Sequence, residues 1–166
     1  MADADFHIQP VPCLSDNYAF VIHNTSDGTA AVVDVPDAAP IKAKLAELGA
    51  TLTDVFLTHH HWDHVDGLPG LDDLRPFKVS GAKADAHRLP DLDIALAEGD
   101  SVTLAGATFE IHDVSGHTVG HLAAHCAALN AVFTADSLMA MGCGRLFEGT
   151  PTQMWESLLK IRALPD

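Results

Sequence analysis

LTDVFLTHHHWDH, residues 52–64, is the most informative segment of this 166-residue chain. Its first seven residues form the kind of short apolar run that predicts a buried β-strand. Four histidines and an aspartate follow within six residues. Along an extended backbone alternate side chains share a side, so His59 and His61 point the same way, and Asp63 and His64 follow where the chain turns. Because imidazole and carboxylate bind divalent metal ions, the segment predicts a strand that ends in a metal site.

Further ligands are expected from distant segments, because five donors within six residues cannot by themselves surround two ions. His117 lies in SGHT (115–118), directly after a predicted strand, and Asp136 ends VFTAD (132–136), just past another. Strand ends are where α/β proteins collect their polar site residues. A lone aspartate after a strand is more often a cap or turn residue. Beside the other ligands, however, its two oxygens can bridge two ions about 3.5–4 Å apart.

The other histidines are expected to have ordinary roles. His117, His121 and His125 recur at four-residue spacing, as on one helix face, but Gly116 and Gly120 weaken any helix there. We therefore expect His121 and His125 in the core or behind the metal ligands. The remaining four have no partner pattern and are expected in packing or surface roles: His7, His23, His87 and His112.

Charge restricts the partners. Nine basic residues against 23 acidic ones give a formal net charge of −14 with histidine neutral. Attraction to nucleic acid or to an anionic membrane would have the wrong sign, so neither is an expected partner. An anionic substrate would depend on local positive charge, from metal ions held by some of the 11 histidines and from Arg145.

The overall composition is that of a folded chain. Hydrophobic residues make up 48% of it, enough for a sizeable core, and one domain is expected over residues 1–166. Three cysteines without a CxxC motif, Cys13, Cys126 and Cys143, fit a reducing cytoplasm. Cys143 has no adjacent base, which disfavours it as a nucleophile. The sequence has neither a signal peptide nor a run of about 18 apolar residues, so a soluble, unprocessed chain is expected.

Periodicity predicts an α/β domain built mainly of short strands. Strands are expected over 6–12, 18–23, 30–35, 52–58, 77–80 and 131–134, with a hairpin over 101–114 that turns at Ala105-Gly106. One helix is expected over 38–48, ended by Gly49, and another begins at the capping box of residues 150–153. The Pro, Gly and Asp-rich stretch 67–99 is expected to form mostly loops and short helices.

Several motifs match a known family. THHHWDH (58–64) resembles the HxHxDH signature of the metallo-β-lactamase superfamily, and GHTVGH (116–121) with VFTADS (132–137) continues it. GCGRLFEGT (142–150) and LSDNY (14–18) resemble the glyoxalase II (hydroxyacylglutathione hydrolase) family in particular. The resemblance covers nearly the whole chain. It implies an α/β fold, an αββα sandwich of two mixed sheets with helices outside.

The resemblance also implies the site residues. One ion would be held by His59, His61 and His117 and the other by Asp63 and His64, with Asp136 bridging. Asp63 would in addition orient the metal-bound hydroxide, and Arg145 and Phe147 stand where the family contacts glutathione, although Lys and Tyr are common at those positions. Two divalent ions are implied, zinc above all, with iron and manganese compatible with the same N and O ligands.

The activity implied is hydrolysis of S-D-lactoylglutathione to D-lactate and glutathione, in methylglyoxal detoxification. Two alternatives stay open: a persulfide dioxygenase on the same scaffold, and a metal-binding chain without catalytic activity. Family members continue past the equivalent of residues 163–166 into a strand whose histidine completes the second ligand set, and then into a helical glutathione-binding domain. The expectation is therefore a catalytic domain that is incomplete at its C-terminal end.

Overall fold

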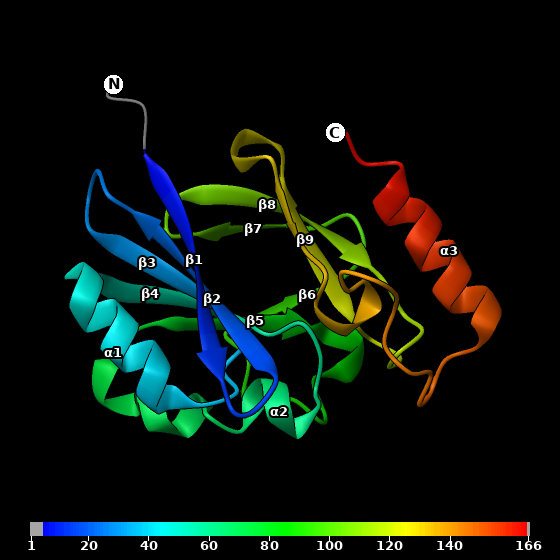
Figure 1. Cartoon of the computed structure of the whole chain (residues 1–166), viewed down its shortest axis with the longest axis horizontal. Helices are drawn as coiled ribbons and strands as arrows, with labels where there is room; N and C mark the ends of the chain where they lie inside the picture. Colours follow the sequence, from blue (N-terminus) through cyan, green and yellow to red (C-terminus); the bar gives the residue numbers. More distant parts are fainter. Residues whose placement is uncertain (1–4, 166) are drawn as a thin grey trace.

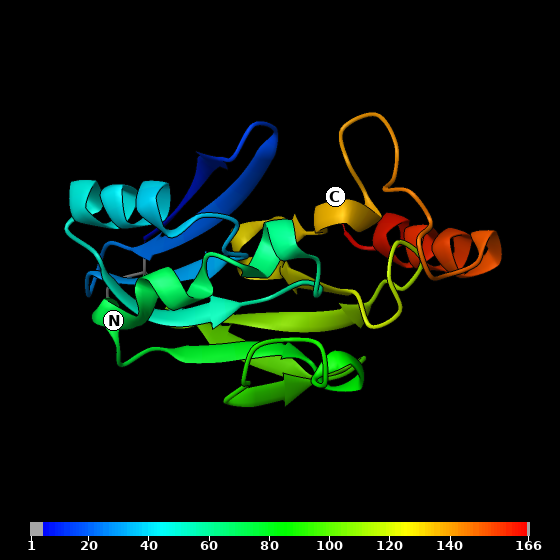
Figure 2. The ribbon, with the colours of Figure 1, turned by 90° about the horizontal axis from the view of Figure 1, so that it is seen from below.

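Two β-sheets pack against each other in the computed structural model, which describes residues 5–165 (Figures 1 and 2). The first sheet has the strand order β1-β2-β3-β4-β5-β6. Strands β1 to β3 are antiparallel neighbours, and β3 to β6 are parallel. The six strands are Phe6–Cys13 (β1), Asn17–Asn24 (β2), Thr29–Val33 (β3), Thr51–Phe56 (β4), Lys78–Ala82 (β5) and Ile94–Leu96 (β6).

The second sheet has the order β10-β9-β8-β7 and is antiparallel throughout. Only the first sheet is therefore mixed within residues 5–165, whereas the resemblance implies two mixed sheets. The four strands are Ser101–Leu104 (β7), Ala107–Asp113 (β8), Leu122–Cys126 (β9) and Ala131–Phe133 (β10).

Most of the predicted elements are confirmed. The helix expected over 38–48 is α1, Ala38–Leu48, and Gly49 ends it in the left-handed conformation (φ 62°). The hairpin of β7 and β8 turns at Ala105-Gly106 as expected. Strands β6 and β9 are not predicted: β6 has three residues, and β9 (LAAHC) is too short and too small in its side chains to show a period.

The core lies between the two sheets. Phe56 on β4 and Phe109 on β8 are both fully buried there. Helix α1 packs against the first sheet and buries Ile41 and Leu45 (Figure 2). Apolar side chains facing one another across the sheets thus supply the main stabilising surface.

The last helix, α3 (Pro151–Arg162), begins with the predicted capping box: Thr150 and Gln153 each accept a hydrogen bond from the other's backbone. Its buried Ser157 donates to the carbonyl of Ser115 at 2.7 Å. Helix α3 is therefore fixed to the loop between β8 and β9, which carries His117. No helix within residues 5–165 is long and apolar enough to cross a membrane.

Loops from both sheets meet at one end of the molecule. The N–H of Leu122, at the start of β9, donates to the carbonyl of Thr58, just past β4, at 2.9 Å. The short helix η4 (Ala135–Ser137) follows β10, and Ser137 donates to the carbonyl of Val114 at 2.9 Å. The loops after β4, β8 and β10 are thereby held together, and each of them carries a predicted metal ligand.

Candidate metal centre

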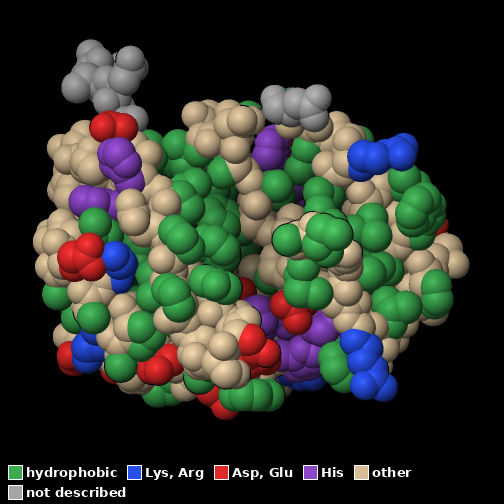
Figure 3. All heavy atoms as spheres, in the orientation of Figure 1, with side chains coloured by type: hydrophobic (Ala, Val, Ile, Leu, Met, Phe, Trp, Pro, Cys, Tyr) green, Lys and Arg blue, Asp and Glu red, His purple; other side chains and the backbone are tan. Residues whose placement is uncertain are grey.

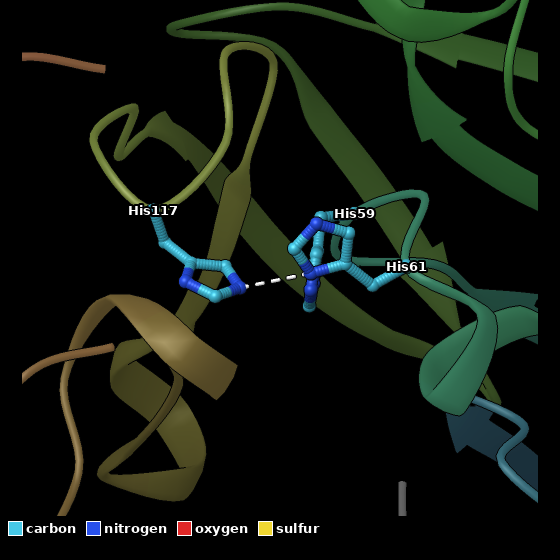
Figure 4. Close-up of side chains that lie close together, drawn as sticks. All are labelled: His59, His61 and His117. Atoms are coloured by element: carbon cyan, nitrogen blue, oxygen red, sulfur yellow. Dashed lines mark hydrogen bonds between the residues drawn. The ribbon is translucent and has the colours of Figure 1, made fainter. Parts of the chain in front are cut away.

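Three histidines from two loops form the first group of donors. One ring nitrogen each from His59, His61 and His117 lies within 4.8 Å of the others. His61 Nδ1 and His117 Nε2 are 2.9 Å apart, and the His59 ring lies close to both of these rings (Figure 4). The Nε2 atom of His59 is buried and has no hydrogen-bond partner within residues 5–165. Since an unpaired buried nitrogen is costly, this cluster fits a bound metal ion.

A second group shares His59 with the first. One donor atom each from His59, His64 and Asp136 lies within 4.8 Å of the others. Asp136 Oδ2 is 3.2 Å from His117 Nε2, and its Oδ1 is 3.4 Å from His64 Nε2. The carboxylate of Asp136 therefore lies between the two groups, as a bridging ligand must.

Asp63 lies at the edge of this arrangement. Its Oδ2 is 3.9 Å from His64 Nε2 and accepts a hydrogen bond from Asn17 Nδ2 at 3.3 Å. It does not belong to either group of converging donors. Six predicted ligands are thus brought together at one end of the two sheets, five of them in tight groups and Asp63 beside them.

Asp34 holds two of the histidines from behind, and sequence reasoning misses it. Its buried carboxylate accepts hydrogen bonds at 2.8 Å from Thr58 N, Thr58 Oγ1 and His64 Nδ1. Because the Thr58 hydroxyl proton goes to Asp34, Thr58 Oγ1 must accept the proton on His59 Nδ1, 3.0 Å away. The Nε2 atoms of His59 and His64 are thereby directed into the cluster.

The sequence indicates neither the Arg145 carbonyl nor Asp34 as a hydrogen-bond partner of the metal ligands. His117 Nδ1 donates to the carbonyl of Arg145 at 2.7 Å, which leaves Nε2 for the cluster. No sequence signal indicates a backbone acceptor. Asp34 lies inside the strand expected over 30–35, whereas β3 ends at Val33, so the strand-end reasoning that indicates Asp136 passes over Asp34.

His121 supports the cluster from inside the core, as expected. It is fully buried, and its ring stacks on that of His59 with centroids 4.5 Å apart and planes 12° apart. Burial lowers the pKa of His121 to about 3. Burial likewise lowers the pKa values of His59 and His61, and neighbouring histidines add to the effect. These rings are therefore neutral, which is the form that binds metal.

His64 has the opposite charge state. Burial lowers its pKa, but the charge of Asp34 and hydrogen bonds to Asp136 and Asp34 outweigh burial and raise the pKa to about 10. Burial raises the pKa of Asp136, but the hydrogen bond and charge of His64 hold it below its usual range. Without metal, a protonated His64 thus lies between two carboxylates, and a metal ion must displace its proton.

The rim of the site is partly apolar. Phe147 is 60% exposed, and its ring lies edge to face with those of His61 and His117, with centroids 5.3 Å apart in each pair. The guanidinium of Arg145 lies 5.2 Å from the Phe147 ring centroid. A groove of about 750 Å³ runs beside His64 and Asp136. Figure 3 shows a hollow on this face, with histidine and acidic side chains gathered at one end.

The segment 142–149 closes over the cluster through backbone hydrogen bonds. Gly144 N donates to the carbonyl of Asp136 at 2.7 Å, and Phe147 N donates to that of His117 at 3.1 Å. A Cβ on Gly144 would lie 2.7 Å from His117 Nδ1 and still closer to the Asp136 carbonyl. There is thus no room for a side chain at this position.

Gly144→Ala should therefore weaken metal binding by at least about tenfold, because the new methyl group forces His117 and Asp136 apart. The measurement is Zn²⁺ affinity by competition with a chromophoric chelator. Gly142→Ala is the matched control, since a Cβ on Gly142 meets nothing within 4 Å. Equal affinities in the two variants would contradict the tight fit.

Glu148 links this segment to two other loops. Its carboxylate accepts hydrogen bonds from the Arg88 guanidinium and from Val119 N, the latter at 2.7 Å. The hydrogen bonds of Arg88 lower the pKa of Glu148 to about 2, against burial, which raises it. A folded pKa below the ordinary 4.5 means that this pair stabilises the fold above about pH 4.5, and that its contribution is lost as the pH falls toward 2.

Glu148→Gln should therefore make unfolding less dependent on pH between about 4.5 and 2, since the variant has no charge to lose there. Urea midpoints of the metal-free chain, measured across this range, test the expectation. Glu47→Gln, which removes an exposed carboxylate paired with Lys44 on α1, is the control. A wild-type pH profile retained in Glu148→Gln would rule out the link.

Comparisons with known proteins give a family model and relatives that this chain matches. The sequence model of the metallo-beta-lactamase superfamily matches residues 14–166. A hydroxyacylglutathione hydrolase of Jannaschia sp. (strain CCS1) is 62% identical over 162 residues, which cover 98% of this chain and 63% of that protein. One from Ruegeria pomeroyi is 63% identical over 96% of this chain and 62% of that protein. The chain therefore spans about 62% of the length of these curated relatives.

Solved structures agree on the fold. The BLEG-1 B3 metallo-beta-lactamase superposes with a TM-score of 0.87 at 23% identity, over 96% of this chain and 88% of that one. ETHE1 from Myxococcus xanthus superposes with a TM-score of 0.79 at 27% identity, over 98% of this chain and 72% of that one. At these identities the likeness supports the architecture and leaves the choice of substrate to the site.

Proposed function

The chain belongs to the metallo-beta-lactamase superfamily, and from this premise we propose that it carries the metal centre of a hydroxyacylglutathione hydrolase. The observation that carries the proposal is the pair of donor groups that share His59 and have Asp136 between them. Relatives of that name match 96% or more of the chain at 62–63% identity. The proposed substrate is S-D-lactoylglutathione, hydrolysed to D-lactate and glutathione, in the cytoplasm.

The donors suit two divalent ions. His59, His61 and His117 would hold one, and His64, Asp63 and Asp136 the other, with Asp136 shared. Nitrogen and oxygen ligands without thiolate suit zinc and are compatible with iron and manganese. When bound, such ions lower the pKa of water toward about 7 and polarise a carbonyl oxygen. The buried, unpartnered Nε2 of His59 supports this occupancy.

The chain's own residues would position the reactants. Asp63, at the edge of the cluster and hydrogen-bonded to Asn17, would orient the attacking water. Asp34, through Thr58, fixes His59, and it holds His64 directly. The leaving group is a thiolate whose conjugate acid has a pKa near about 8.5, so it departs without a strong general acid. No acid from the chain is therefore needed on that side.

Substrate contacts are proposed for Arg145 and Phe147. Both are exposed; the Phe147 ring lies against those of His61 and His117, and the Arg145 guanidinium lies over the Phe147 ring. In a chain of net charge −14, the Arg145 guanidinium beside the metal centre would attract the carboxylates of glutathione. The face of the Phe147 ring would pack against the aliphatic part of the thioester.

The proposal is tested with the 166-residue chain stripped of metal and reloaded with Zn²⁺, Fe²⁺ or Mn²⁺. We expect at least two ions per chain by mass spectrometry and release of a thiol from S-D-lactoylglutathione, with the stripped chain inactive. One ion per chain and no thiol release would instead support a metal-binding chain without activity. Sulfite production from glutathione persulfide and O₂ would support the dioxygenase alternative. Either of these results would overturn the proposal.

A further inference from the structure

The outer face of the second sheet carries a separate cluster of metal-binding side chains. On β8 the buried residues Phe109 and Ile111 alternate with Glu110 and His112, which face away from the core. On β9, His125 faces the same way and lies directly opposite Glu110 in the antiparallel register. Cross-strand and diagonal neighbours lie within reach of each other on such a face, so strand pairing alone brings the three side chains together.

Their geometry is that of a ligand set. One donor atom each from Glu110, His112 and His125 lies within 4.8 Å of the others. The two imidazole rings have centroids 6.1 Å apart. His112 Nδ1 faces Glu98 Oε1 at 3.9 Å, and His112 Nε2 is buried with no hydrogen-bond partner in the part of the chain that the structure describes. A histidine that served only as a packing residue would direct its nitrogens to water or to a hydrogen-bond partner.

This cluster is separate from the centre at the strand ends. It shares no residue with either donor group there. Its side chains point away from the core between the sheets, because Ile111 and its partner Ala124 fill the inner face at the same level. A ligand here would therefore bind independently of the first centre.

We propose that Glu110, His112 and His125 form a site for one divalent transition-metal ion such as Zn²⁺. Two imidazoles and one carboxylate are a common zinc ligand set, and a water can complete the tetrahedron. The antiparallel strands hold the ligands rigidly, so the ligands lose little conformational freedom when an ion binds. An ion here would join β8 to β9 across the loop that carries His117.

The test counts ions and measures Zn²⁺ affinity in His112→Gln/His125→Gln, a double variant of side chains outside the core. We expect one ion fewer per chain than in the wild type. The matched control is His7→Gln/His23→Gln, because these two histidines also lie on neighbouring strands, as direct partners on β1 and β2, but belong to no group of three donors within residues 5–165. The control should keep every ion.

Glu110→Gln provides a second, milder test, because Glu110 is exposed and its replacement leaves packing unchanged. We expect at least a tenfold weaker affinity for the additional ion. Ion counts and affinities equal to the wild type in both the double variant and Glu110→Gln would overturn the site. Loss of the same ion from the His7 and His23 control would also overturn it, because the effect would then not be specific to this face.

Discussion

Asp136→Asn should leave the centre at the strand ends with at most one tightly bound metal ion. The two oxygens of Asp136 lie 3.2 Å from His117 Nε2 and 3.4 Å from His64 Nε2, so one carboxylate serves both donor groups. An amide has the same shape but carries no charge, and its NH₂ group repels a cation. Thioester hydrolysis should fall about a thousandfold, because metal stabilisation of the transition state is worth several kcal/mol and each ~1.4 kcal/mol is tenfold in rate.

The measurement is metal content after dialysis, together with thiol release from S-D-lactoylglutathione. Asp27→Asn is the control: this exposed turn aspartate accepts hydrogen bonds only from Thr29 among the described residues. Asparagine is equally suited to a turn, so the control should keep the wild-type number of ions and full activity. A wild-type number of ions in Asp136→Asn would show that this carboxylate does not bridge.

The donor groups could be predicted from the sequence, because each donor follows a predicted strand along the chain. HHHWDH concentrates its donors directly after an apolar strand, and His117 and Asp136 each follow a predicted strand. Strands that end at the same edge of a sheet bring the residues that follow them close together, even when the pairing of the strands is unknown. Omitting β6 and β9 therefore had little effect on the predicted site.

The residues that support the ligands are harder to predict from the sequence, because their roles depend on tertiary contacts. Asp34 lies inside the strand expected over 30–35, and only folding places its carboxylate between Thr58 and His64. In the same way, Glu110 and His125 are distant in sequence and become neighbours only through the register of β8 and β9. His112, expected in an ordinary role, joins them in that way. Strand register is the information that periodicity does not contain.

Asp34→Asn should weaken metal binding more than a substitution of any other residue that holds the metal ligands by hydrogen bonds. Asp34 adopts a left-handed conformation (φ 58°), which asparagine also tolerates, so the substitution removes charge and leaves the backbone unchanged. The amide cannot accept all the protons that Thr58 and His64 now donate. His59, held through Thr58, and His64 would no longer be oriented with Nε2 toward the cluster, and Zn²⁺ affinity should fall roughly 10- to 100-fold.

The metal-free chain should also lose about 3 kcal/mol of unfolding free energy, because a buried charged hydrogen-bond network is broken on one side. Chelator competition and urea unfolding measure the two effects. The control is Asp54→Asn on β4: its carboxylate is half-buried and accepts from Thr53 Oγ1 and Ala105 N, and within residues 5–165 it has no hydrogen bond with a histidine. Asp54→Asn should lower stability alone. If Asp34→Asn likewise changed stability but not Zn²⁺ affinity, its carboxylate would support the fold without directing the ligands.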